Sequence, residues 1–380
     1  MGASGATTAG PAIRTATPAD RPAIAELIGR VGFDDDVGDA VAAPVAADLL
    51  PANADIPGLP GRAFEPGWVI EVEGRIAGSL ENRIQPYVLG PDSLVAAAAS
   101  AMIIEPPLRS LSMSLIDQYV RQPGIDLLLD TTATAAAARL FTTFFRFRQP
   151  PGPSFGEVAF WITDGPAFAH YLGRRRGGWW QRLAPALTPA AMAARLLRRP
   201  PTAWRRGAEI RLAPLETLDP GFDELFAAIR TAKPDVLLAR RDRAGLQWRF
   251  ARTAREGRLT LLEAHRAGRL DGYLALGRYD QPRLGFCRLR VIDLVARNDD
   301  AVVLKALLAA AHDVAKRQRV AVLEVVGLPT PIRTLIGTGR PLQRRMASNP
   351  YLFRALRPGL ETRLAVEAAW YPTSIDGDAC

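Results

Sequence analysis

The sequence has few residues of the kinds that build disulfide frameworks or metal sites. Only Cys287 and Cys380 are cysteines among its 380 residues, too few for a disulfide framework. The three histidines are scattered, and neither cysteine neighbours one, so the sequence predicts no metal site. His312 lies one position off the apolar stripe of its predicted helix, and we expect it on the helix surface.

Long apolar runs are also missing. No run reaches the roughly 18 residues of a membrane span, and the start of the chain lacks the basic and apolar regions of a secretory signal. Neither a Walker-type nor a dinucleotide-binding fingerprint occurs. Together with the scarcity of cysteine, these absences lead us to expect a cytoplasmic protein.

What the sequence does have is a hydrophobic content of 48% and a net charge of +9. The abundance of alanine and arginine is typical of a GC-rich bacterial genome. The charge is uneven, because ten arginines between Trp161 and Arg211 stand against only Asp164 and Glu209, with tryptophans interleaved. Three interpretations stay open for this segment: a solvated connector between domains, a weak contact with an anionic membrane surface, or a contact with nucleic acid. The connector is favoured, and no nucleic-acid partner is expected.

The chain contains two halves with the same order of predicted elements. Each half opens with a strand and a helix, and continues through a hairpin and a long strand to a second helix. A buried strand, a helix and a closing strand follow, at Glu157–Ile162 in the first half and Leu364–Trp370 in the second. This order predicts an α/β fold with one domain over residues 11–163, a basic connector over 164–208 and a second domain over 209–372.

The most informative stretch joins the long strand of the first half to the helix that follows it. The apolar strand ends at Pro106 and Pro107, Arg109 follows, and a loop of small residues leads into an amphipathic helix over about Ser110–Arg121. A strand–loop–helix of this kind directs backbone N–H groups and a helix N-terminus at one spot. Such a spot suits an anionic group, for example a pyrophosphate.

The spacing Arg109-x-x-Ser112-x-Ser114 resembles the coenzyme-A pyrophosphate loop of the Gcn5-related N-acetyltransferase family, with serines where glycines are usual. "EVEGRIAGSL" resembles the second and third strands of that family, "IEPPLR" the approach to its cofactor loop, and "TTATAAAARLFTTFFRF" the helix after its fifth strand. The resemblance covers most of the chain in a tandem form. It implies two acyl-CoA N-acyltransferase-like domains, each a mixed, twisted sheet flanked by helices.

The resemblance also implies a reaction and a set of site residues. Acetyl-CoA or another acyl-CoA would lie between splayed strands, and an amine of a small molecule or a protein would attack the thioester directly, without a metal. For proton transfer, the resemblance implies Glu105 and Glu81 as candidate general bases. Tyr119 is a candidate general acid, in place of the tyrosine that the family often has on the helix after its fifth strand. The implied cofactor-binding residues are Met102, Ile103, Ile104, Arg109, Leu111, Ser112, Met113 and Ser114.

Two departures from the family pattern favour an alternative, a catalytically silent scaffold or binding protein with the same fold. Phe141 stands where the family often has a tyrosine that protonates the leaving thiolate, and phenylalanine has no proton to donate. In the second half, Asp299 and Asp300 replace the cofactor loop and would repel a phosphate. We therefore expect cofactor binding in the first half only. The leading prediction is an acyl-CoA-dependent N-acyltransferase, cytoplasmic, and membrane-peripheral where the connector contacts lipid.

Overall fold

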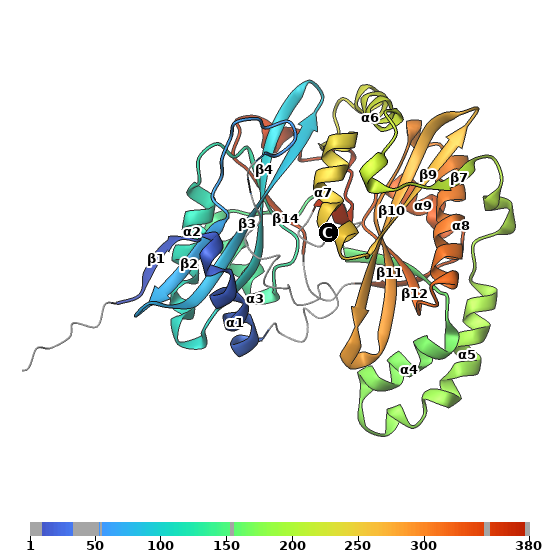
Figure 1. Cartoon of the computed structure of the whole chain (residues 1–380), viewed down its shortest axis with the longest axis horizontal. Coiled ribbons are helices and arrows are strands. Elements are labelled where there is room, and N and C mark those ends of the chain that lie inside the picture. The colour runs from blue at the N-terminus through green and yellow to red at the C-terminus, as the bar shows by residue number, and fades with distance from the viewer. Residues whose placement is uncertain (1–9, 33–52, 54, 153–155, 346–349, 377–380) are drawn as a thin grey trace, which may run out of the picture. The chain divides into compact units, whose positions relative to one another are not determined.

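The computed structural model describes residues 10–32, 53, 55–152, 156–345 and 350–376. The chain divides into two compact units, each with its own sheet (Figure 1). The first unit comprises Met1–Pro86, Leu94–Gln149 and Ser348–Glu361, and the second comprises Tyr87–Ser93, Pro150–Ala347 and Thr362–Cys380.

The first sheet has the strand order β1-β2-β3-β4-β5-β14, and β4 pairs with β5 in parallel. Val69 and Ile103 pack against the apolar stripe of α1, whereas Trp68 packs edge-on against Tyr119 of α2. Successive strand residues point to opposite faces, so α1 and α2 cover opposite faces of this sheet. The bounds are β1 Ala12–Thr15, α1 Arg21–Val31, β2 Gly67–Val72, β3 Arg75–Leu89, β4 Asp92–Ile104, α2 Ser112–Arg121, β5 Leu127–Asp130, α3 Ala135–Phe145 and β14 Leu352–Ala355.

The second sheet has the order β13-β6-β12-β11-β10-β9-β7, with β11 and β12 parallel. Helix α8 packs on β9, β10 and β11, and its apolar residues supply much of this core. The strands are β6 Glu157–Ile162, β7 Glu209–Leu212, β9 Leu259–Arg266, β10 Arg269–Gln281, β11 Phe286–Ala296, β12 Val322–Val326 and β13 Leu342–Arg345. The helices are α6 Gly221–Ala232, α7 Arg243–Arg255, α8 Ala301–Arg317, α9 Thr330–Gly337 and α10 Leu360–Arg363, and a two-residue strand β8, Leu238–Ala239, pairs with the end of β3.

The closing strands differ from the prediction. Glu157–Ile162 is a strand, but it pairs with β12 and β13 of the second sheet, and β14 takes the place beside β5 in the first. The first unit therefore does not run to residue 163. Its segment ends at Gln149, and a later segment that begins at Ser348 completes it. Leu364–Trp370 is no strand, because Glu367–Ala369 forms a 3-10 helix there. A short apolar run indicates a strand but carries no signal for its partner.

The predicted basic connector is helical and belongs to the second unit. It forms a hairpin of α4 (Gly165–Arg176) and α5 (Ala184–Leu197), followed by a 3-10 helix at Thr202–Arg205. Tyr171 of α4 stacks on Phe286 of β11 with ring centroids 3.9 Å apart, which fixes the hairpin to the sheet.

The expectation that His312 lies on the helix surface is wrong, because its side chain on α8 is buried. Burial disfavours the charged imidazolium and lowers the pKa of His312 to about 4. At neutral pH this histidine is therefore uncharged.

Candidate functional site

At one end of the first sheet, β4 residues Ser100–Ile104 run past the end of β5 at Asp130, and we call this region the first fork. The parallel pairing of β4 with β5 covers only Ala96–Ala99, and β4 then continues. Ala101 has a φ of +46°, a left-handed value that is rare for a residue with a Cβ and marks a break in the strand. Beyond the break, the N–H of Glu105 donates to Ala77 of β3 at 2.9 Å. Strand β4 thus stays beside β3 beyond the end of its pairing with β5.

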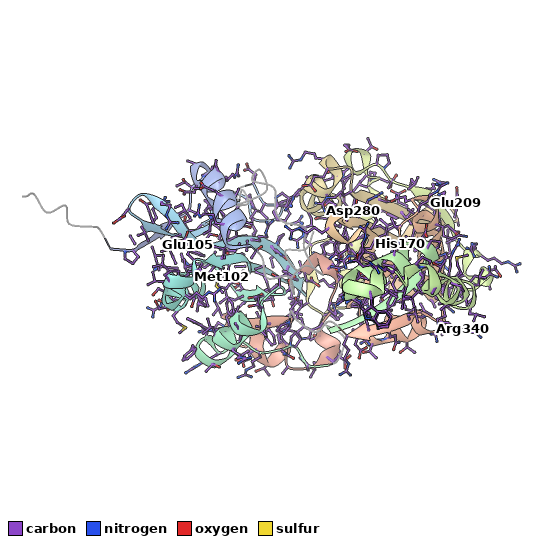
Figure 2. All side chains as sticks on the ribbon, turned by 90° about the horizontal axis from the view of Figure 1, so that it is seen from below. Met102, Glu105, His170, Glu209, Asp280 and Arg340 are labelled. Atoms are coloured by element: carbon purple, nitrogen blue, oxygen red, sulfur yellow. The ribbon has the colours of Figure 1, made fainter. Side chains whose placement is uncertain are left out.

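Met102, Ile103 and Ile104, which the resemblance implies as cofactor-binding residues, direct their peptide groups to alternate sides of β4. Because Glu105 faces β3 and strand peptides alternate in direction, the peptide groups of Met102 and Ile104 face the fork. The side chains of Ile103 and Ile104 are buried, and Ile103 lies in the core beneath α1. Met102 is half-buried, and Figure 2 shows it near Glu105.

The predicted pyrophosphate loop is a 3-10 helix, Pro106–Leu111, that runs directly into α2. Ser112 has φ −56° and ψ −38°, ordinary helical values, which explains why a serine fits where the family usually has glycine. Its N–H donates to the carbonyl of Arg109, so this amide is already used. Arg109 and Ser114 are exposed, and Leu111 and Met113 are half-buried.

Tyr119 lies at the base of the fork, fully buried. Its hydroxyl bridges the two strands, 2.6 Å from the carbonyl oxygen of Ala97 and 2.9 Å from that of Leu129. Burial raises the pKa of Tyr119 well above its usual value. A hydroxyl held by the carbonyls of both strands ties them together, and this placement argues against Tyr119 as the acid that protonates a leaving thiolate.

Phe141 packs edge-on against Tyr119 and Phe147, with ring centroids 6.4 Å and 4.8 Å away. It is a buried core residue and supplies no proton. Helix α3 ends at Phe145, because Arg146 adopts a left-handed cap with a φ of 58°. Phe147 then fills the place in the core.

The two predicted bases do not converge. Glu105 lies between two arginines, with Arg75 Nη2 at 2.9 Å and Arg30 Nη2 at 3.1 Å from its carboxylate. The hydrogen bond from Arg75 lowers the pKa of Glu105, which makes it a weaker base. Glu81 is buried on β3 with Arg83 at 3.0 Å. It lies four residues along β3 from Ala77, the backbone partner of Glu105, a distance of about 13 Å.

The second sheet has a fork in the same topological position, between β11 residues Ile292–Ala296 and the end of β12. Pairing of β11 with β12 ends at Val291, and a register shift near Ala275 marks an irregularity in the pairing with β10. This second fork is filled by the chain itself. The hydroxyl of Tyr371 donates to the carbonyl of Leu294 at 2.8 Å, and Pro372 accepts the N–H of Leu328.

Charged groups are buried in the second fork, and sequence reasoning missed them. Arg241 pairs with Asp293 at 2.9 Å and donates to Thr373 at 3.2 Å. Asp376 accepts hydrogen bonds from the N–H of Thr373 at 2.7 Å and from the hydroxyl of Tyr87 at 2.8 Å. Burial raises the pKa of Asp376 to about 6. The only sequence signal was a similarity between two segments, Trp-Ile-Thr-Asp-Gly from Trp161 and Trp-Tyr-Pro-Thr-Ser-Ile-Asp-Gly from Trp370. This similarity did not indicate that the second segment fills a fork.

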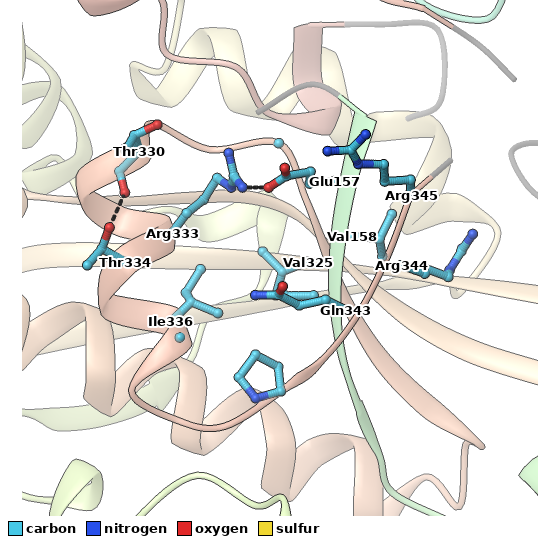
Figure 3. Close-up of a pocket in the computed structure, with 14 residues that line it drawn as sticks. Glu157, Val158, Val325, Thr330, Arg333, Thr334, Ile336, Gln343, Arg344 and Arg345 are labelled. Carbon is cyan, nitrogen blue, oxygen red and sulfur yellow. Dashed lines mark hydrogen bonds and ion pairs between the residues drawn. The ribbon is translucent and has the colours of Figure 1, made fainter. Parts of the chain in front are cut away.

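A separate pocket of about 590 Å³ lies in the second unit, lined by α9, β6, β12 and β13 (Figure 3). Arg333, Arg344 and Arg345 give its lining a positive charge, and Val158 and Ile336 contribute apolar surface. Two of these arginines already hold carboxylates, because Arg333 pairs with Glu157 and Arg344 with the buried Glu324. An incoming anion would have to compete with both carboxylates, so the pocket is a weaker candidate than the first fork.

Comparison with known proteins supports the architecture. The sequence matches no protein-family model and no curated protein. Among solved structures, a Gcn5-related N-acetyltransferase from Anabaena variabilis ATCC 29413 aligns over 92% of this chain and 73% of its own, with 13% identity and a TM-score of 0.51. A protein of unknown function from Enterococcus faecalis V583, described as a probable N-acyltransferase, aligns over 93% and 74%, with 8% identity and a TM-score of 0.54. What these proteins share with the chain is the fold, a mixed α/β architecture that spans both units, as predicted.

Proposed function

We propose that the chain is an acyl-CoA-dependent N-acyltransferase and that the first fork holds the acyl-CoA. The observation that carries the proposal is that β4 runs past the end of β5 with a break at Ala101, so that the peptide groups of Met102 and Ile104 face away from β3. A pantetheine arm carries amide groups, so it can pair with these peptides as an added strand does. The buried Tyr119 and Phe141 close the base of the fork.

The turn after β4 fits the pyrophosphate in part. Arg109 is exposed on this turn, and the first turn of α2 presents the N–H groups of Met113 and Ser114 at a helix N-terminus, which favours an anion. Ser112 contributes less, because its N–H is used within the turn. We therefore assign most of the phosphate binding to Arg109.

The reaction requires little covalent chemistry from the protein. An amine attacks the thioester carbonyl directly, and the chain positions the reactants and accepts the proton of the amine. Glu105 is a weak base, because Arg75 and Arg30 stabilise its carboxylate. Glu81 pairs with one arginine, Arg83, so we assign the proton-accepting role to Glu81. A general acid is dispensable, because a thiol with a pKa of about 8.5 is a good leaving group as its thiolate.

A silent binding protein is the second candidate, and specific observations favour it. Phe141 cannot donate a proton, and Glu105 is held by Arg75 and Arg30. A protein of this kind would bind acyl-CoA without releasing its thiol, or would not bind it.

Thermal unfolding with acetyl-CoA and longer acyl-CoAs, followed by an assay for free thiol with a panel of amines, tests both candidates. At a free ligand concentration 100 times its Kd, binding stabilises the protein by about 2.7 kcal/mol. Arg109→Ala should weaken binding by about 1–3 kcal/mol, as expected for a charge-assisted phosphate contact. Arg121→Ala, at the exposed far end of α2, is the matched control and should leave affinity unchanged.

Stabilisation with thiol release supports the transferase. Stabilisation without thiol release for any amine supports the silent protein. No stabilisation by any acyl-CoA contradicts the assignment of the first fork.

A further inference from the structure

The outer face of α5 is apolar, although it faces solvent. Its exposed side chains recur at helical spacing and are Pro185, Ala186, Pro189, Ala190, Ala193, Leu196 and Leu197. Leu196 and Leu197 are 60% and 73% exposed. A surface helix normally turns its charged side chains to water, and α5 has one charged residue, the half-buried Arg195. We call this face, together with Trp179, the apolar strip.

The opposite side of α5 is fixed to the second unit, so the apolar strip cannot turn inward without unpacking. Ala191 is buried on this side. Met192 lies so close to Gly165 of α4 that a Cβ on the glycine would fall 2.7 Å from its sulfur. Helix α5 also contacts β6. The exposure of the strip is therefore a consequence of packing within the second unit.

A pair of tryptophans stands where α4 turns into α5. The rings of Trp179 and Trp180 stack with centroids 4.4 Å apart, and the guanidinium of Arg176 lies 4.6 Å from the ring centre of Trp180. Trp179 is 61% exposed, an unusual exposure for a large aromatic side chain. The third tryptophan of this region, Trp204, is buried, so only Trp179 and Trp180 stand at the turn of the hairpin.

The segment that carries the apolar strip has charge of one sign, although Arg205 near its end pairs with Asp313 of α8. No acidic residue occurs between Asp164 and Glu209. Cations flank both ends of α5, because Arg182 precedes it and Arg198 and Arg199 follow it, all three exposed. The arginines of this stretch are Arg174, Arg175, Arg176, Arg182, Arg195, Arg198, Arg199, Arg205 and Arg206.

We propose that the α4–α5 hairpin is a docking surface for an anionic lipid bilayer. Lipid matches every part of the surface: acyl chains accept the apolar strip, the headgroup level accepts Trp179, and anionic headgroups accept the flanking arginines. Nucleic acid would use the arginines but leave the apolar strip of α5 uncovered. Among the described helices none is long and apolar enough to cross a membrane, so the contact is with the bilayer surface.

Sedimentation of the full chain with vesicles tests the proposal. One set of vesicles contains phosphatidylglycerol and phosphatidylcholine, and the other contains phosphatidylcholine alone. We expect binding to the anionic set only, reduced at least tenfold in 0.5 M salt, where the screening length is roughly 4 Å. Each arginine near the surface contributes about fivefold to the partition coefficient.

Three double variants separate the contributions. Arg182→Gln with Arg199→Gln should lower partitioning by about 25-fold, as two cations of about fivefold each predict. Trp179→Ser with Leu197→Ser should lower partitioning at least tenfold and also the part of binding that survives high salt. Leu212→Ser with Arg317→Gln replaces an exposed leucine and an exposed arginine of the same unit outside the hairpin, and should change nothing. Equal melting temperatures of the variants establish that each is folded.

Three results would overturn the proposal. The first is no binding to anionic vesicles at low salt. The second is binding that the hairpin variants and the control variant reduce equally. The third is that Trp179→Ser with Leu197→Ser converts an oligomer to a monomer in size-exclusion chromatography with light scattering while vesicles remain unbound, which would make the strip an interface between copies of the chain.

Discussion

The two sheets have forks in the same topological position, and the forks differ in which groups bond to their strands. In the second, Tyr371 and Pro372 bond to the strand β11 and to Leu328, and Arg241 neutralises Asp293 beneath them. In the first, the pairing of β4 with β5 ends at Ala99, before Met102 and Ile104.

Buried peptide groups must find partners, and the two forks find them in different ways. The second fork uses the chain's own C-terminal segment, which makes this part of the sheet protein core. In the first fork, the proposed acyl-CoA would supply the partners of the peptide groups. Duplication of a fold thus does not duplicate its site, and occupancy of the fork distinguishes the halves more clearly than the loop sequences do.

The largest effect is expected from breaking the buried ion pair of the second fork. Arg241→Met leaves Asp293 buried without its cation, which should lower the free energy of unfolding by about 3–5 kcal/mol in urea titration. Arg211→Met removes an arginine from an exposed pair with Glu209 and should leave the unfolding free energy unchanged. Equal effects of the two variants would mean that the second fork is not a buried core.

Asp376 in the second fork should also make stability depend on pH in the acid range, and His312 of α8 should have the opposite effect. Burial raises the pKa of Asp376 from 3.8 to about 6, so between these values the folded state binds more protons and stability falls as pH rises. Burial lowers the pKa of His312 from 6.5 to about 4, so over that window the unfolded state binds more protons and stability rises with pH.

These two slopes oppose each other between pH 4 and pH 6. Relative to the parent chain, His312→Gln should remove a rise of about 3 kcal/mol with increasing pH, and Asp376→Asn a decline of similar size. Urea titrations of the parent chain and of both variants at a series of pH values measure the two differences. Differences of the same sign would refute the opposed titrations.

The tyrosines of the two forks provide a matched comparison of intermediate size. Tyr119→Phe removes a hydroxyl that donates to the carbonyl of Ala97 and accepts the N–H of Leu129, and should cost about 1–3 kcal/mol, whereas Tyr371→Phe removes one hydrogen bond and should cost about 1 kcal/mol. If the chain is a transferase, the rate of thiol release should persist in Tyr119→Phe, because this hydroxyl serves the sheet. Loss of turnover in a stably folded variant would restore Tyr119 as the acid.

The smallest effect concerns the end of α3 beside the first fork. Arg146 holds a left-handed cap that suits glycine, so Arg146→Gly should raise the unfolding free energy by up to about 1 kcal/mol. Arg139→Gly, in the exposed interior of the same helix, should lower it by about 1 kcal/mol. Thermal melts of both variants decide whether the cap, rather than the arginine side chain, sets the stability of this turn.

Much of the fold follows from local pattern. The sequence predicted most helices of both halves and the long strands because apolar periodicity is a local property, although it did not predict α7. The neighbours in structure confirm the α/β acyltransferase-like architecture. The exchange of β6 and β14 between sheets was missed, because strand partners depend on contacts far apart in sequence.

The site was less accessible to sequence reasoning. The predicted loop residues do lie together at the end of β4, but the serines adopt helical angles instead of an open loop. The ion pairs that hold Glu105 come from Arg30 and Arg75, each far away along the chain, and no spacing rule indicates them. Arg241, Tyr371 and Asp376 meet in the second fork for the same reason.

Calorimetric titration of the full chain with acetyl-CoA tests the difference between the forks most directly. We predict one binding site per chain, weakened by Arg109→Ala and unchanged by Arg297→Ala at the corresponding turn of the second unit. Two equivalent sites, or a single site that Arg297→Ala abolishes and Arg109→Ala leaves intact, would contradict the assignment of the first fork as the acyl-CoA site.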